Sequence, residues 1–185
     1  MLTLNAHMQA SADGQVTVHP VLELDAHPHN RYLVECFDAA GELRWREEVD
    51  NLIPDAGAND LLTQYLAGVN YSATWNVGLV DNTGFSAFAN TDTAMGHPGW
   101  TETASYANAT RPALSLGAAG GRSITNAANP AVFNISGTIF INGAFIVSSP
   151  TKGGTAGVLY GEASFSTPRD VLSGDTLNVT VTLSA

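Results

Sequence analysis

Short runs in which apolar and polar residues alternate recur along the chain and predict a fold made mostly of β-strands. In the clearest run, Leu177, Val179, Val181 and Leu183 share one side of a strand, and the residues between them are polar. Comparable runs predict strands over residues 31–37, 42–46, 75–80, 132–135, 138–148 and 158–166. About eight strands predict an all-β sandwich or jelly-roll-like domain.

Turn-forming residues separate and interrupt these runs. Residues 38–41 lie between two predicted strands and indicate a β-hairpin. Residues 1–30 predict an extended arm that leads into the strands, and Pro20 confines its apolar run to an edge or a bend. Gly143 interrupts a long apolar run and predicts a bulge.

Residues 51–68 hold the one segment with a helical period. Asp55 or Asn59 can cap the start of this helix, and Gly68 can end it. The apolar residues that recur at helical spacing are Leu61, Leu62, Tyr65 and Leu66. We therefore expect one short helix packed on a sheet, because so short a helix is not stable alone.

The sequence predicts a weakly marked boundary near residue 70, which divides the chain into two parts. Residues 1–70 would hold the arm, the β-hairpin and the short helix, and residues 71–185 would form the C-terminal β-sandwich. The length fits one domain equally well, so the two parts either share one core or form separate units.

Two long stretches show neither the helical period nor the alternation of a strand. Residues 81–106 hold Trp100 among small, turn-forming residues, and such a stretch cannot build a core of its own. Trp100 is therefore expected to fill a hydrophobic pocket on this chain or on a neighbour. Residues 117–130 begin Gly-Ala-Ala-Gly-Gly and lack the lysine and spacing of a phosphate-binding loop, so they predict a surface loop.

Charge narrows the classes of partner. Only 13% of the residues are charged, against about 25% in an average domain, which indicates that much of the surface meets other protein. The net charge is -10 and Lys152 is the only lysine, so no basic patch for nucleic acid is expected.

The single cysteine and the apolar segments exclude other classes. Cys36 has no partner for an intrachain disulfide and lies in a strand-like run, which favours a buried structural thiol. The N-terminus lacks the pattern of a signal peptide, and no apolar run is long enough to span a membrane. We expect a protein made in a reducing cytoplasm, with no cofactor.

One pattern suggests a metal site. Asp25, His27 and His29 alternate, so on a strand they would project from one face and offer two imidazoles and a carboxylate to zinc or iron. Pro28 between the histidines favours an exposed polar turn instead, and we expect no bound metal.

A second pattern suggests acid–base chemistry. His97 lies near Asp92 and Glu102 in a segment broken by glycine and proline, without any recognised hydrolase or protease motif. We expect His97 and Glu102 to hydrogen-bond to loop backbone, and Arg111 and Tyr106 to help order the same loop. Neither a catalytic residue nor an enzymatic activity is predicted.

Aromatic residues leave open a carbohydrate-binding module. Trp45, Trp75 and Trp100 on a β-sandwich are of the type that stacks on sugar rings, although only Trp100 is predicted to lie in a loop.

Residues 49–183 carry a sequence pattern with a family resemblance. The segments are Asn51-Leu52-Ile53, Gly57, Val77-Gly78-Leu79, Asp92-Thr93, His97 to Glu102, Tyr106, Arg111-Pro112, Ile124 to Asn126, Phe133 to Ile135, Ile141 to Phe145, Lys152 to Thr155 and Gly174 to Leu177. In order and spacing they resemble a group of small virion structural proteins of tailed bacteriophages, similar to capsid decoration or cement proteins.

The resemblance implies a function without catalysis. A cement protein binds the outside of a preassembled shell, bridges neighbouring major capsid subunits and stabilises the shell. The implied partners are the major capsid protein and copies of the chain itself, with a trimer favoured over a dimer. The same resemblance is compatible with a tail, neck or baseplate component, and a glycan-binding module on the virion is a further alternative.

Overall fold

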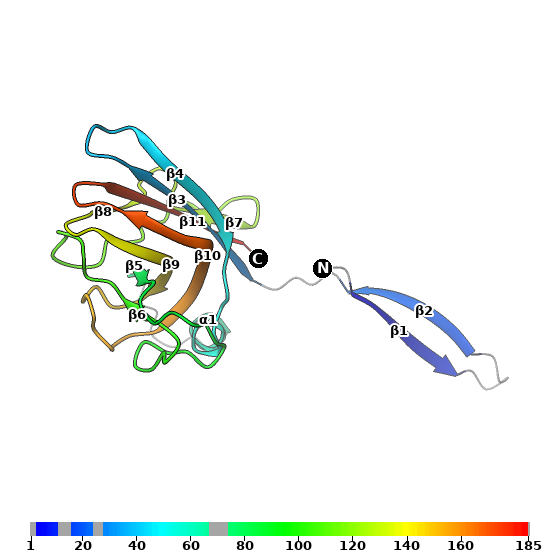
Figure 1. Cartoon of the computed structure of the whole chain (residues 1–185). Coiled ribbons are helices and arrows are strands. Elements are labelled where there is room, and N and C mark those ends of the chain that lie inside the picture. Colours follow the sequence, from blue (N-terminus) through cyan, green and yellow to red (C-terminus); the bar gives the residue numbers. More distant parts are fainter. Residues whose placement is uncertain (1–2, 11–15, 24–27, 67–73, 185) are drawn as a thin grey trace.

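Two antiparallel β-sheets packed face to face form the body of the chain (Figure 1). The computed structural model describes residues 3–10, 16–23, 28–66 and 74–184. One sheet contains, in order, β10 (Leu159–Val171), β9 (Ile139–Val147), β5 (Asn76–Asp81) and β6 (Thr101–Glu102). The other contains β4 (Leu43–Asp50), β3 (His29–Phe37), β11 (Thr176–Ser184) and β7 (Ser123–Thr125), and β8 (Ala131–Asn134) also pairs with β11. The predicted all-β sandwich is confirmed.

The alternating C-terminal run becomes β11, a central strand of the second sheet. Leu177, Val179 and Val181 are fully buried against the other sheet, and each such side chain contributes roughly 1.5–3 kcal/mol. Other side chains of this core include Tyr32, Val34, Cys36, Val77, Leu79, Phe133, Ile141 and Ile146. Because β3 and β5 both supply members, the segments on either side of residue 70 contribute to one core.

The predicted hairpin is confirmed as β3 and β4. These strands pair antiparallel, and Asp38 closes the turn between them by accepting the N–H groups of Ala40 and Glu42, both at 2.9 Å. Gly41 has a φ of 85°, a left-handed conformation that suits glycine.

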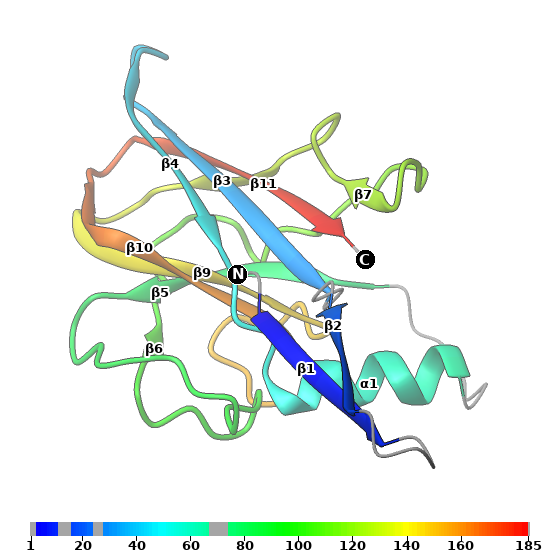
Figure 2. The same cartoon turned by 90° about the vertical axis from the view of Figure 1, so that its right-hand side faces the viewer.

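The predicted helix is confirmed as α1 (Asp55–Leu66), which packs against β10 (Figure 2). Pro54 precedes it, and its carbonyl accepts the N–H groups of Gly57 and Ala58 at 2.9 and 3.1 Å. A Cβ at Gly57 would lie 2.6 Å from the Tyr160 carbonyl oxygen, so glycine allows this close approach. The predicted end at Gly68 lies outside the described residues.

Within the described ranges, no helix has the length and apolar content needed to cross a bilayer.

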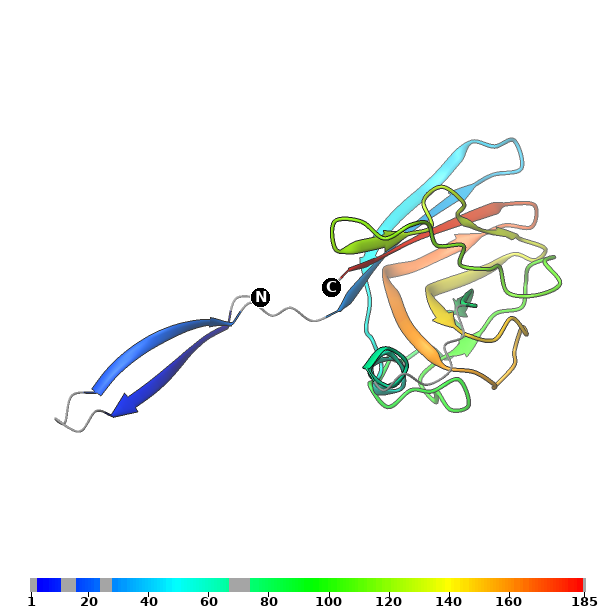
Figure 3. The same cartoon turned by 180° about the vertical axis from the view of Figure 1, so that it is seen from behind.

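The N-terminal segment forms a hairpin of β1 (Thr3–Ala10) and β2 (Val16–Glu23). Figures 1 and 3 show this hairpin apart from the sandwich. The predicted apolar run around Pro20 corresponds to β2, whereas β1 was not singled out as a strand, although its residues alternate between polar and apolar from Thr3 to Ala10. Their pairing supplies backbone hydrogen bonds that a single extended arm would lack.

Two strand boundaries differ from the prediction. The expected loop of residues 117–130 contains β7, which pairs with the end of β11 over three residues. β10 continues through Pro168 to Val171, with a register irregularity between Ser164 and Arg169 that accommodates the proline.

The predicted bulge at Gly143 is confirmed. β5 pairs Val80 with Gly143 and then Asp81 with Ile141, so Asn142 is the extra residue.

Replacing Gly143 by alanine is expected to lower the free energy of unfolding by about 1–3 kcal/mol, the usual cost of overpacking. The new Cβ would lie 2.2 Å from the Ala163 carbonyl oxygen, which is fixed in the sheet. Gly120→Ala is the control, since nothing lies within 4 Å of the Cβ position there. Urea denaturation measures both, and equal stability of the two variants would contradict the expectation.

Candidate functional site

Residues 82–100 cover the face of β5 and β9 that points away from the core between the sheets. They contribute Ala94, Trp100 and the partly buried Phe85 and Phe88 to a second hydrophobic cluster. The sheet contributes Val80, Phe145, Val147 and Leu159. A stretch without a period of its own is thus ordered by packing across a sheet.

Trp100 fills the centre of this cluster and is only 3% exposed. Its ring centroid lies 4.9 Å from that of Phe145 and 5.8 Å from that of Phe88, the second pair edge to face. The indole Nε1 donates to Asp92 Oδ2 at 3.0 Å, which satisfies the polar atom of the buried ring. Trp100 therefore occupies a hydrophobic pocket of its own chain.

Asp92 and Gly99 shape the backbone around the indole. Asp92 also accepts the N–H of Ala89 at 3.1 Å, so one carboxylate holds both the ring and a turn. A Cβ at Gly99 would lie 2.2 Å from the Ala87 carbonyl oxygen. Only glycine therefore allows the backbone at residues 87 and 99 to approach so closely.

His97 packs on the indole rather than on a carboxylate. Its ring is stacked on Trp100 with a centroid distance of 3.8 Å, and its Nδ1 lies 2.9 Å from the Trp100 carbonyl oxygen. Asp92 contacts the indole instead, and Glu102 contacts Arg111. The structure thus does not assemble Asp92, His97 and Glu102 into an acid–base group.

Glu102 and Arg111 form a buried ion pair with two parallel hydrogen bonds. Arg111 Nε donates to Oε1 at 2.8 Å and Nη2 donates to Oε2 at 2.7 Å, and the side chains are 5% and 3% exposed. Arg111 also donates to the carbonyls of Ser149 and Gly154, and Glu102 accepts the N–H of Gly153 at 2.6 Å. The pair therefore joins β6 and the segment after it to the loop between β9 and β10.

Tyr106 and Lys152 extend the same connection. The Tyr106 hydroxyl lies 3.5 Å from Glu102 Oε1, and burial together with that carboxylate raises the pKa of the phenol. Lys152 Nζ donates to the Tyr106 carbonyl at 2.9 Å and lies 4.4 Å from the centre of its ring. The only lysine is thus used to hold this loop in place.

A cavity of ≈ 250 Å³ lies between these groups and is lined by His97, Trp100, Glu102, Arg111 and Gly153, among others. Every polar side chain named here already has a partner within the protein, which leaves them committed to joining loops. The five predicted site residues, Trp100, His97, Glu102, Arg111 and Tyr106, therefore lie together. Their contacts join residues 97–111 to the loop between β9 and β10, which is about 40 residues further along the chain.

Glu162 is a buried ionisable group that the sequence analysis did not single out. It is fully buried on β10, and neither carboxyl oxygen has a hydrogen-bond partner among the described residues. Burial, and then the nearby Asp92 carboxylate, raise its pKa to about 8, although the Trp100 indole opposes the shift. A glutamate between Gly161 and Ala163 in an apolar strand was the available signal.

The charge of Glu162 makes stability depend on pH. The folded state keeps its proton up to about pH 8, whereas the unfolded chain loses it near 4.5, so unfolding releases a proton between these values. This contribution is complete below pH 4.5 and is lost as the pH rises through 8.

Replacing Glu162 by glutamine should therefore remove this pH dependence. At pH 9 the variant is expected to be more stable than the parent by about 1–3 kcal/mol, the usual cost of a buried polar group without a partner. Urea denaturation from pH 5 to pH 9 measures the effect, and Glu42→Gln, at an exposed position, is the control. A parent whose stability does not fall over this range would contradict the assignment.

Further ion pairs close one side of the sandwich. Arg169 contacts Glu47 at 2.5 Å, and Arg44 bridges Asp170 and Asp175. These pairs join β4 to β10 and to the turn before β11.

Cys36 is fully buried, and burial together with Asp175 raises the pKa of its thiol to about 12, despite Arg44 nearby. It is therefore an unreactive thiol at neutral pH.

The residues considered for a metal site are mostly outside the described part of the chain. Asp25 and His27 lie outside the described residues, and the side chain of His29 is not described either. Among the described side chains, no three or more of His, Cys, Asp and Glu are placed to hold a metal ion.

The three tryptophans do not form a common surface. Trp45 and Trp75 are partly buried and pack against the main core, whereas Trp100 belongs to the second cluster. With 3% exposure, Trp100 offers no open ring face to a sugar.

No protein-family model matches this chain, and a search of curated proteins found no match either.

Proposed function

We propose that this protein is a non-enzymatic structural component of a tailed-bacteriophage virion. It would bind the outside of the major capsid protein lattice as a decoration protein and stabilise the shell. Its partners would be the major capsid protein and other copies of itself.

One observation carries the proposal furthest. The residues in the phage-like pattern, from His97 to Glu102, with Tyr106, Arg111 and Lys152 to Thr155, meet at the buried ion pair. They join residues 97–111 to the loop between β9 and β10, and the side chains of His97, Trp100, Glu102, Arg111 and Lys152 all have partners within the protein. A pattern that serves to hold surface loops rigid fits a protein whose function is to present a surface.

The rigid loops also suit repeated binding. Interface loops that are already ordered lose less conformational entropy on binding than mobile ones. Many copies on one lattice add avidity, so each contact needs only modest affinity. With 13% charged residues, the chain offers mainly amide and hydroxyl groups for such contacts.

Co-sedimentation with capsid shells that lack the protein tests the proposal. Saturable binding at many sites per shell is the expected result, in a fixed ratio to the major capsid protein. The control is the same protein unfolded in urea and diluted with the shells at a urea concentration that keeps it unfolded. Absence of saturable binding by the folded protein would overturn the decoration role.

A tail, neck or baseplate component is the second candidate, because the sequence resemblance extends to such locations. Imaging of virions with a labelled copy separates the two. Label over the whole head supports decoration, and label at one vertex or along the tail supports the second candidate. A glycan-binding module is the weaker alternative, since Trp100 has no exposed ring face.

A further inference from the structure

Residues 82–100 form a closed loop over the outer face of the sheet that contains β5 and β9. The two ends of the loop lie side by side, because Asp81 pairs with Thr101 where β5 meets β6. Within the loop, the Ser86 N–H donates to the Gly99 carbonyl at 2.8 Å, which holds its two halves together. The loop can therefore leave the sheet without separating the strands that anchor it.

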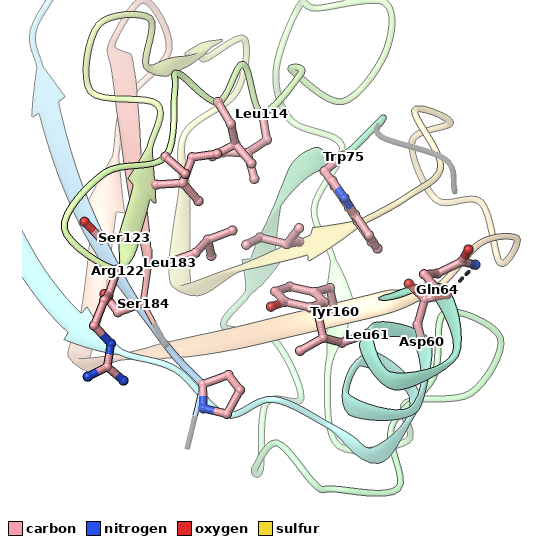
Figure 4. A pocket seen from close by; sticks show the side chains of 15 residues that line it. Asp60, Leu61, Gln64, Trp75, Leu114, Arg122, Ser123, Tyr160, Leu183 and Ser184 are labelled. Carbon is pink, nitrogen blue, oxygen red and sulfur yellow. Dashed lines mark hydrogen bonds between the residues drawn. The ribbon is translucent and has the colours of Figure 1, made fainter. Parts of the chain in front are cut away.

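The loop is held on the sheet mainly by the second hydrophobic cluster. Its side chains in that cluster are Phe85, Phe88, Ala94 and Trp100. One backbone hydrogen bond, from the Asp55 N–H to the Asn90 carbonyl at 2.8 Å, also ties it to the start of α1. The apolar groove beside α1 is lined instead by side chains of the core between the sheets, such as Trp75, Leu114 and Tyr160 (Figure 4). Opening of the loop would expose the second cluster and leave the groove and that core intact.

Glu162 places a buried carboxyl group under this loop. The residue is fully buried on β10, and neither carboxyl oxygen has a hydrogen-bond partner among the described residues. Its ionisable neighbours are Asp92 in the loop, Tyr32 on β3 and Asp50 at the end of β4. None of these three is basic, so a charge on Glu162 would be buried beside another carboxylate without a counter-charge.

We propose that this loop is a proton-controlled cover, which opens as a unit when the Glu162 carboxyl loses its proton while the core between the sheets stays closed. In the closed form, an ionised Glu162 lies next to Asp92 in an apolar site, whereas in the open form water solvates the charge. Residues 82–100 contribute no strand to either sheet, so their release costs less than separation of the sheets. The surface uncovered on the sheet includes Phe145 and Val147. This inference goes beyond the proposed function and does not depend on shell binding.

The pKa of Glu162 sets the direction of the change. It is raised to about 8 in the closed form, and in the open form it returns towards its ordinary value of 4.5. Opening therefore releases a proton between these values. The equilibrium constant for opening should rise about tenfold for each pH unit from about pH 5 to about pH 8 and then level off.

Hydrogen–deuterium exchange of the full-length protein from pH 5 to pH 9, followed by mass spectrometry, tests the proposal. Peptides from residues 82–100 report on the loop, and peptides from β11 report on the core. After division by the intrinsic exchange rate at each pH, the loop should be less protected than β11 and its opening constant should show the tenfold rise per pH unit. Glu162→Gln should remove this rise, whereas Glu42→Gln, at an exposed position, should retain it.

Cys36 provides a second measurement of the core, since it is fully buried between the sheets. At pH 8 a thiol reagent should leave Cys36 unmodified over the time in which the loop exchanges. Equal protection of the loop and β11, or an opening constant that does not change with pH, would overturn the proposal. The same pH dependence in Glu162→Gln would overturn it as well. No shells are present, so these outcomes are distinct from failure of the decoration role.

Discussion

Replacing Trp100 by alanine is expected to lower the free energy of unfolding by about 3–5 kcal/mol, the usual loss for a large buried aromatic side chain. The substitution empties the centre of the second hydrophobic cluster and removes the contacts with Phe88 and Phe145. It also leaves Asp92, 2% exposed, without the indole that donates to it. Urea denaturation followed by circular dichroism measures the change.

Two controls separate the causes. Trp100→Phe retains most of the packing and loses the hydrogen bond to Asp92, so a smaller loss of about 1–3 kcal/mol is expected. Met95→Ala alters a side chain that is 81% exposed in the same segment, and its effect should stay within about 0.5 kcal/mol. A loss below about 1 kcal/mol for Trp100→Ala would contradict the buried position of the ring.

Replacing Arg111 by methionine should cost about 3–5 kcal/mol, because Glu102 then remains buried without its counter-charge. The carbonyls of Ser149 and Gly154 lose their donor in the same variant. Denaturation at neutral pH measures the loss, and limited proteolysis should show earlier cleavage in the loop between β9 and β10.

Removing the charges of both Glu102 and Arg111 distinguishes the cost of an unpaired buried carboxylate from the cost of lost packing. The variant with Glu102→Gln and Arg111→Met should be more stable than Arg111→Met alone, since no unpaired charge remains. Arg31→Met is the exposed control: its partners are Glu48 and Asp50, its side chain is 56% exposed, and about 0–1 kcal/mol is expected. Equal losses for Arg31→Met and Arg111→Met would contradict a buried pair.

Trp100→Ala and Arg111→Met also connect stability with the proposed function. Both loosen surface loops without altering the core between the sheets, which is a separate cluster. If the decoration role is correct, shell binding should weaken in both, because the loops would have to be ordered on contact.

The regular elements were predictable because their signals are local. The alternation from Leu177 to Leu183 depends only on which side of a strand each residue faces, and β11 follows it. The helical spacing around Leu61 and the turn at Asp38 are similarly local, and α1 and the β3–β4 turn appear where expected. Gly143 marked its bulge for the same reason.

Weak or short signals were the ones missed. β7 has three residues, too few for a period, and exists because the end of β11 offers it a partner. β1 is an exception: its residues alternate between polar and apolar from Thr3 to Ala10, a signal that the prediction of an extended arm did not use, and it pairs with β2. The length of β10 past Pro168 depends likewise on neighbouring strands.

The sequence by itself determined the class of the fold, the position of most strands and the helix, and the low share of charged residues. Only the tertiary structure decided how the candidate residues are used. Glu102 and Arg111, nine residues apart, meet in a buried ion pair that also holds the loop at Gly153, while Asp92 turns to Trp100 instead of His97. The raised pKa of Glu162 has the same origin, since it depends on a loop folding over the sheet. Periodicity reports the face on which a side chain lies, but contacts between distant segments depend on how the sheets and loops pack.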